Sequence, residues 1–163
     1  MNSPQINSGV RIVIDAMGGD YAPDINIEGA ILALNEDPDI KIVLVGDRDL
    51  ILKHLKKHGA KESDRLEVLH AEEVITMEDH ASQGMRKKKK SSIHVGLQQV
   101  KEGKAHAFIS AGNSGAVMAV AILVLGRLDG VERPAILVKL PSMESFVTLL
   151  DAGANVDCKP SHL

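Results

Sequence analysis

Three segments of the sequence place small residues beside polar or charged side chains, a combination that suits the binding of an anion. The first is Asp15-Ala16-Met17-Gly18-Gly19-Asp20. The pair Gly18-Gly19 lets backbone N–H groups approach an anion closely, and Asp15 and Asp20 can orient a ligand or hold a cation. The competing interpretation is a tight turn in which Asp20 caps nearby structure. The segment lacks both the glycine spacing of a dinucleotide fingerprint and the lysine of a P-loop.

The second segment leads from a short apolar run into an almost wholly apolar helix pattern. Its sequence is Ser110-Ala111-Gly112-Asn113-Ser114-Gly115-Ala116. Gly112, Asn113 and Ser114 stand at the predicted helix start, where backbone N–H groups can hold an anion. The pattern is equally consistent with a helix N-cap at Asn113 or Ser114, preceded by small residues that permit close packing.

The third segment is a run of cations followed by two hydroxyls, Arg86-Lys87-Lys88-Lys89-Lys90-Ser91-Ser92. Such a run is often a solvated loop. Here it directly precedes a predicted helix, whose N-terminus already carries positive partial charge. Five adjacent cations repel that helix end and one another unless an anion compensates them. The segment therefore indicates a phosphate site, an acidic partner, or both, with Ser91 or Ser92 capping the helix.

Other candidates for chemistry are weaker. Asp151-Ala152-Gly153-Ala154-Asn155-Val156-Asp157 repeats the arrangement of glycine and carboxylates after a predicted strand. It either brings Asp157 into the same crevice or forms another turn. Cys158 has no supporting His or Asn arrangement for a nucleophile. The seven histidines show no metal-ligand spacing, so we expect neither a metal nor a cofactor.

The elements that must position these segments alternate between short strands and helices. The apolar runs predict strands at residues 10–14, 40–45, 66–69, 107–109, 135–138 and 146–150, and helical periodicity predicts helices around Ile27–Leu34 and at residues 49–58, 92–102 and 114–125. Such alternation is typical of an α/β fold with a mainly parallel sheet. Ligands of these folds bind at the carboxyl ends of the strands, where the three segments fall.

Composition excludes several classes of protein. The 163 residues carry a net charge of −3 and no tryptophan, which argues against a nucleic-acid binder. A single cysteine excludes a disulfide scaffold and suits a reducing compartment. The polar start lacks the pattern of a secretory signal, and the longest apolar run, residues 116–125, is about half a membrane span. We therefore expect a cytoplasmic protein.

The end of the sequence has the pattern of an interrupted fold. Residues 146–150 form a buried-type strand, which in a parallel sheet requires a covering helix. Lys159-Pro160-Ser161-His162 then has the composition of a helix start. We expect the chain to be the N-terminal portion of a longer protein.

Four ordered motifs together resemble those of the bacterial phosphate acyltransferase family. They are Asp15 to Asp20 with Ala22-Pro23, Arg86 to Ser92, Ser110 to Ala116, and Leu150 to Pro160. The likeness covers residues 10–163 in one register, and four motifs in order are more specific than any one of them. The sequence departs from the family pattern at Lys90, where an aspartate is common, and at Ser114, which replaces a common threonine.

The resemblance implies a truncated three-layer αβα fold related to isocitrate and isopropylmalate dehydrogenases and to phosphotransacetylase. Residues 1–9 would be a flexible tail and residues 10–163 the N-terminal portion of the α/β domain. The implied reaction transfers a fatty acyl group from acyl-acyl carrier protein to inorganic phosphate, giving acyl phosphate for phospholipid synthesis. The implied enzyme is a cytoplasmic homodimer with peripheral membrane contact.

The resemblance also assigns roles within the motifs. Arg86, Lys88, Lys89, Ser91 and Ser92 would hold phosphate, with Asn113 and Ser114 assisting at their helix start. Amides near Gly18-Gly19 or Gly112 would form an oxyanion hole, and Asp15 and Asp157 would orient cations and hydroxyls. Two alternatives remain open: a phosphotransacetylase-like enzyme acting on acyl-coenzyme A, and a non-catalytic module that binds an anion or an acidic protein.

Overall fold

The computed structural model describes residues 9–79 and 86–153 of the chain. The chain divides into two compact units, Met1–Leu125 and Gly126–Leu163. The first unit contains the three candidate anion-binding segments, residues 15–20, 86–92 and 110–116.

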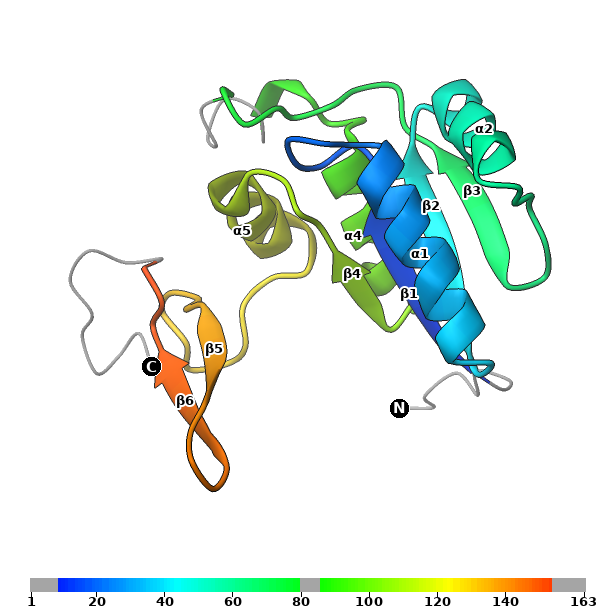
Figure 1. Cartoon of the computed structure of the whole chain (residues 1–163). Coiled ribbons are helices and arrows are strands. Elements are labelled where there is room, and N and C mark those ends of the chain that lie inside the picture. The colour runs from blue at the N-terminus through cyan, green and yellow to red at the C-terminus, as the bar shows by residue number, and fades with distance from the viewer. Residues whose placement is uncertain (1–8, 80–85, 154–163) are drawn as a thin grey trace. The chain divides into compact units, whose positions relative to one another are not determined.

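Four parallel strands form the sheet of the first unit, in the order β3-β2-β1-β4 (Figure 1). They are β1 (Val10–Asp15), β2 (Ile40–Gly46), β3 (Leu66–His70) and β4 (Ala107–Ile109). Val13 of β1 lies opposite Val43 of β2 on one side and Phe108 of β4 on the other. Because the strands are parallel, the loops after β1 and β4 leave the sheet side by side.

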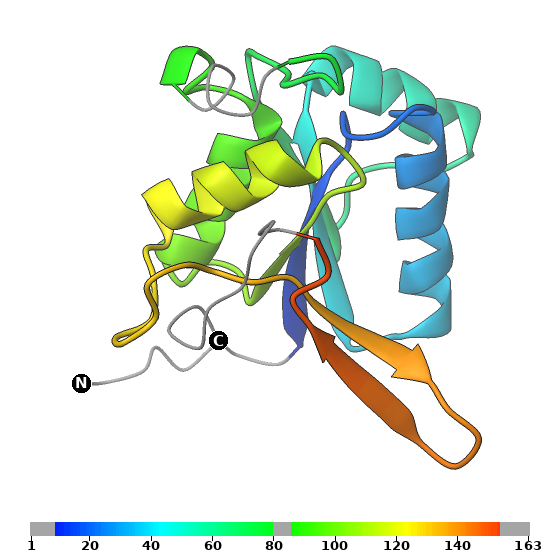
Figure 2. The same cartoon turned by 90° about the vertical axis from the view of Figure 1, so that its left-hand side faces the viewer.

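Helices cover both faces of this sheet, as Figure 2 shows edge-on. The alternation of β2 separates the faces: Ile42 and Leu44 pack with α1 (Asp24–Glu36) and α2 (Arg48–Lys57), whereas Val43 and Val45 face α4 (Ser92–Lys101). Helix α5 (Ser114–Val124) packs on α4 around Ile93, Leu97, Ala116 and Val120. The predicted α/β fold with a mainly parallel sheet is thus confirmed.

Polar side chains start three of the helices. Asp47 accepts a hydrogen bond from the Leu50 N–H of α2, Ser91 from His94 of α4, and Asn113 from Ala116 of α5. Of the alternatives that the sequence left open, Ser91 rather than Ser92 caps α4, and Asn113 rather than Ser114 caps α5. Gly59 lies two residues after the end of α2 with φ of +71°, a left-handed conformation that favours glycine and is common where a helix ends.

The second unit contains an antiparallel hairpin of β5 (Leu137–Pro141) and β6 (Phe146–Leu150). The prediction that residues 146–150 form a buried strand is wrong, because every residue of β6 is exposed. Only residues 142–145 connect the two strands, and this is too short for the crossover that parallel pairing needs. Strand β5 also begins two residues later than predicted.

Within residues 9–79 and 86–153, none of the helices has the length and apolar character needed to traverse a bilayer. The almost wholly apolar α5 has 11 residues.

Candidate functional site

Asp15, the last residue of β1, connects the loops that follow β1 and β4. Its side chain is buried, with 2% of the residue exposed. One carboxylate oxygen accepts a hydrogen bond from the Met17 N–H at 3.0 Å, and the other accepts from the Ser110 hydroxyl at 2.8 Å. The Ser110 oxygen in turn accepts from the Gly112 N–H at 3.1 Å. The carboxylate of Asp15 therefore holds two strand-end loops in a fixed relation.

The two loops approach so closely that Gly18 cannot carry a side chain. A Cβ placed on Gly18 would lie 2.6 Å from an Asp15 carboxylate oxygen and 2.8 Å from the Gly112 nitrogen. Asn26 of α1 fixes the same loop by donating to the carbonyls of Asp15, Ala16 and Gly18. The Gly18 and Gly19 N–H groups have no acceptor among the residues that the structure describes. Gly18 is buried, whereas Gly19 is partly exposed.

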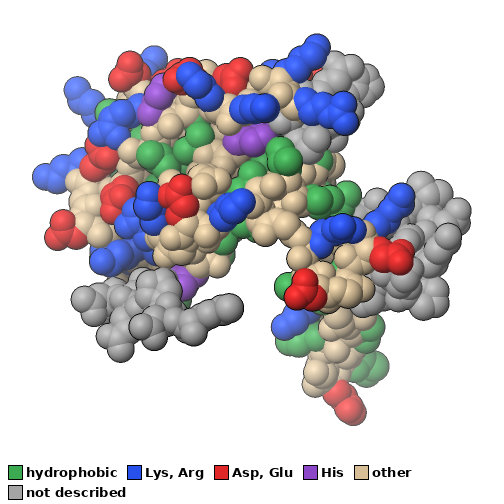
Figure 3. Space-filling view, turned by 180° about the vertical axis from the view of Figure 1, so that it is seen from behind, with side chains coloured by type: hydrophobic (Ala, Val, Ile, Leu, Met, Phe, Trp, Pro, Cys, Tyr) green, Lys and Arg blue, Asp and Glu red, His purple; other side chains and the backbone are tan. Residues whose placement is uncertain are grey.

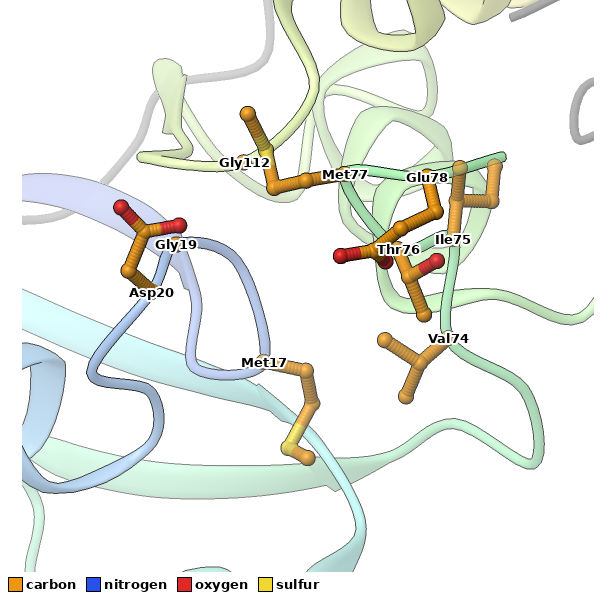
Figure 4. Close-up of a pocket in the computed structure, with 9 residues that line it drawn as sticks. All are labelled: Met17, Gly19, Asp20, Val74, Ile75, Thr76, Met77, Glu78 and Gly112. Atoms are coloured by element: carbon orange, nitrogen blue, oxygen red, sulfur yellow. The ribbon is translucent and has the colours of Figure 1, made fainter. Parts of the chain in front are cut away.

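A pocket of about 290 Å³ opens beside these loops. Figure 4 shows Met17 and Asp20, from the loop after β1, facing the segment Val74–Glu78 across the pocket. Gly19 and Gly112 complete the lining. The segment Val74–Glu78 follows β3, so loops after three of the four parallel strands meet around one pocket. No motif of the sequence marks this segment, and its place after a predicted strand is the only signal that points to it.

The turn Thr76–Asp79 joins the start of α5 to the basic segment. The Asn113 amide donates to the carbonyls of Thr76 and Asp79, at 3.4 and 3.0 Å. Lys88 donates to the Val74 carbonyl at 2.8 Å and forms an ion pair of 2.5 Å with the Asp79 carboxylate. The Lys88 ammonium, followed by the Thr76 N–H, holds the pKa of Asp79 below its usual value. Lys88 and Asn113, two of the predicted site residues, thus both contact Asp79.

Carboxylates within the chain compensate part of the basic segment. Besides the Lys88–Asp79 pair, Lys90 pairs with Glu72 at 2.8 Å, which raises the pKa of Lys90 and lowers that of Glu72. Within the described chain, Arg86, Lys87 and Lys89 have no carboxylate at ion-pair distance. Figure 3 shows Lys and Arg side chains, in blue, on the surface seen from behind. Three exposed cations remain available to an external anion.

The serine pair lies inside the molecule. Ser91 is fully buried and Ser92 is 1% exposed. The Ser91 hydroxyl lies 2.9 Å from Nδ1 of His94 in the first turn of α4, and the Ser92 N–H donates to the Glu73 carbonyl. The Ser92 contact anchors the basic segment to the chain after β3. Ser114, by contrast, is exposed at the start of α5.

The C-terminal candidates belong to the second unit. Asp157 lies outside the described residues. Asp151, in the second unit, accepts a hydrogen bond from the Ile136 N–H at 2.8 Å, at the base of the hairpin. Among the described residues, no group of three or more His, Cys, Asp or Glu side chains is arranged to hold a metal ion.

Comparison with known proteins places this site in a family context. A family model described as "Fatty acid synthesis protein" matches residues 10–163. A phosphate acyltransferase of Myxococcus xanthus is 49% identical over 94% of this chain and 44% of its own length. A phosphate acyltransferase from Anaeromyxobacter is 51% identical to it, over 93% of this chain and 42% of the length of the relative. The chain thus spans less than half the length of the curated relatives it matches.

Solved structures agree on the fold. A phosphotransacetylase from Streptococcus pyogenes superposes with a TM-score of 0.59 at 14% identity, covering 86% of this chain and 46% of its own. A second phosphotransacetylase, from Staphylococcus aureus, gives a TM-score of 0.52 at 16% identity, and the match covers 86% of this chain and 45% of that one. At these identities the likeness supports the α/β fold alone.

Proposed function

The chain belongs to the fatty acid synthesis protein family, and we propose that the full-length protein transfers an acyl group from a thioester to inorganic phosphate. Curated relatives that carry the name phosphate acyltransferase support this reaction. The observation that carries the proposal is the turn Thr76–Asp79, which joins the start of α5 to the basic segment beside the loop after β1. These are the parts that a phosphate nucleophile and a developing oxyanion require.

In the proposed reaction, a phosphate oxygen attacks the thioester carbonyl and the C–S bond breaks. The thiol leaves with a proton, and the acyl group remains on phosphate. We propose that Lys88, Lys89 and Arg86 attract and hold phosphate, with Asn113 and the exposed Ser114 at the positive end of α5. The Gly18 and Gly19 N–H groups would stabilise the tetrahedral oxyanion, because the Gly112 N–H already donates to Ser110.

The buried position of several predicted residues changes their proposed roles. Ser91 caps α4 and Ser92 is enclosed, so both would position the basic segment rather than touch phosphate first. Asp15 would likewise position the loops through Met17 and Ser110. Asp157 keeps its proposed role as an orienting carboxylate without a described position.

We propose acyl-acyl carrier protein as the acyl donor, since such carriers are acidic and Arg86, Lys87 and Lys89 are exposed cations. Acyl-coenzyme A is the alternative. From the family resemblance we also propose that the protein is a cytoplasmic homodimer with peripheral contact to the cytoplasmic membrane. The same resemblance suggests a relation to the fold of the isocitrate dehydrogenases. Light scattering and sedimentation with anionic vesicles test the assembly and the membrane contact.

The decisive experiment is an assay of the full-length protein for acyl phosphate formed from phosphate and either acyl-acyl carrier protein or acyl-coenzyme A. Lys89→Ala should raise the KM for phosphate by about tenfold, the loss expected for one charge-assisted contact. Lys101→Ala, an exposed lysine at the end of α4, is the matched control. Binding of carrier protein without phosphate-dependent thioester loss would favour the non-catalytic module instead.

A further inference from the structure

One asparagine of α1, Asn26, fixes the direction of three peptide groups in the loop after β1. Its Nδ2 atom lies 3.2 Å from the carbonyl oxygen of Asp15, 3.1 Å from that of Ala16 and 2.8 Å from that of Gly18. An amide oxygen in this place would face three other acceptors, so the –NH2 group of the side chain lies here and donates. The asparagine is half-buried in the first turns of α1, so the helix holds it against the loop.

A fixed carbonyl also fixes the N–H group of the next residue, because each of these peptides is trans and planar, with C=O and N–H in opposite directions. Opposite the first carbonyl, the Ala16 N–H donates to the Val45 carbonyl at 2.9 Å. Opposite the second, the Met17 N–H donates to the Asp15 carboxylate at 3.0 Å. Opposite the third, the Gly19 N–H has no acceptor among the described residues. The asparagine therefore holds in place a donor that the described chain does not use.

The Gly19 N–H group is turned away from α1. Gly19 borders two hollows: one of about 140 Å³, which includes Ile25 and Asn26 of α1, and the pocket of about 290 Å³ in Figure 4, which has no residue of α1 among its described lining residues. Since the N–H points away from Asn26, it faces the second hollow. Gly19 is partly exposed, whereas Gly18 is buried. Of the two glycines, Gly19 is thus the one whose N–H has both a fixed direction and access to a ligand.

We propose that Asn26 is a positioning residue of the acyl transfer, which acts by directing the Gly19 N–H toward the oxyanion. The inference rests on the proposed function, and it narrows the proposed oxyanion donors from two glycines to Gly19. As a phosphate oxygen adds to the thioester carbon, an electron pair moves onto the carbonyl oxygen, and it returns when the C–S bond breaks. A correctly directed donor binds this oxygen more strongly in the transition state than in the substrate.

The kinetic test uses the full-length protein with phosphate and either acyl-acyl carrier protein or acyl-coenzyme A. Asn26→Ala removes the –NH2 group, and Asn26→Asp keeps the size but sets an acceptor against the three carbonyls. Losing an oxyanion donor costs about 100- to 1,000-fold in kcat, so a misdirected one should cost at least about tenfold, with the KM for phosphate changed less than about twofold. Asn35→Ala, at an exposed asparagine near the end of the same helix, is the matched control.

Residual dipolar couplings measure the direction of the Gly19 N–H group without turnover. In the full-length wild type and in Asn35→Ala, the coupling should agree with an N–H opposite to the Gly18 carbonyl. In Asn26→Ala the Gly19 coupling should change, while the couplings of the β1 amides stay the same. Gly18-Gly19 is the only pair of adjacent glycines in the 163 residues, so labelling with 13C,15N-glycine helps to assign this signal.

Three results would overturn the proposal: an unchanged kcat in both Asn26 variants, an effect confined to the KM for phosphate, or an unchanged Gly19 coupling in Asn26→Ala. Urea unfolding of each variant separates these effects from a loss of folded protein, because a merely unfolded fraction lowers kcat without moving the Gly19 coupling of the folded molecules. If the wild-type protein makes no acyl phosphate with either donor, the proposed function fails and its oxyanion role for Gly19 with it. The dipolar couplings then still decide whether Asn26 directs the Gly19 N–H.

Discussion

At the scale of single residues, Asp15 is a buried carboxylate at a strand end whose hydrogen bonds join two loops. Both of its oxygens accept hydrogen bonds from within the chain, from the Met17 N–H and the Ser110 hydroxyl. Gly18 and Gly112 pass it so closely that a methyl group on Gly18 would collide with the carboxylate. Asp15, Ser110 and the glycines form one unit that positions the backbone N–H groups for the proposed oxyanion.

We expect Asp15→Ala to lower the free energy of unfolding by about 2–4 kcal/mol, because buried hydrogen bonds to a charged group are worth roughly 1.5–3 kcal/mol each and are partly interdependent. Urea unfolding of the full-length protein measures this change. Asp20→Ala, which changes an exposed carboxylate of the same loop, should cost less than about 0.5 kcal/mol. Equal losses in the two variants would show that the Asp15 contacts do not stabilise the fold.

At the scale of elements, one carboxylate connects α1 and α2, the helices that pack on the face of β2 with Ile42 and Leu44. Asp24, in the first turn of α1, contacts three side chains: His54 at 2.8 Å and Lys57 at 2.7 Å, both of α2, and His58, which follows α2, at 2.9 Å. Lys57, followed by His54 and His58, holds the pKa of Asp24 far below its usual value. Since α1 directly follows the Gly18-Gly19 loop, this contact also supports the site.

The lowered pKa of Asp24 predicts a pH-dependent contribution to stability. An ionised, paired carboxylate stabilises the fold above its unfolded pKa of about 4, and the stabilisation is lost as the pH falls toward the folded value. Asp24→Asn should therefore be less stable than wild type between pH 5 and 7, and the difference should shrink below about pH 4. Chemical unfolding across this range tests the prediction. Asp64→Asn, at an exposed aspartate without an ion pair among the described residues, should show no such trend.

At the scale of the whole molecule, the two units differ in how much of their apolar surface is covered. The first contains three clusters of buried apolar residues around its sheet. The hairpin of the second exposes Leu137, Met143, Phe146 and Val147, with 68% of Phe146 accessible. A two-stranded hairpin is only marginally stable by itself in water, and exposed apolar patches commonly mark interaction sites.

Hydrogen exchange of the 163-residue chain should separate the two units. Amides of β1 and β2, in the middle of a sheet covered on both faces, should exchange only through global unfolding, whereas those of β5 and β6 should exchange at least about a hundredfold faster. Mass spectrometry of peptides from the two regions measures the ratio, with the edge strand β3 as an internal comparison. Equal protection of β2 and β6 would contradict the marginal stability of the hairpin.

The sequence by itself determined the features that depend on neighbours along the chain. Apolar periodicity located the strands and helices, the caps at Ser91 and Asn113 followed from local hydrogen bonding, and motif order indicated the family. Contacts between distant segments could not be derived in this way, because they depend on the strand order β3-β2-β1-β4. Only the tertiary structure brought Ser110 to Asp15 and paired Lys88 with Asp79.

The strand order also decided which residues line the pocket. It placed the segment after β3 opposite the loop after β1, so Val74–Glu78 became a wall of the site although no motif marked it. The burial of Ser91 and Ser92 likewise follows from the packing of α4 against the sheet, since a solvated loop and an anchored one have the same local composition. Local patterns supplied the chemical groups, and the meeting of three strand ends decided which of them line the pocket.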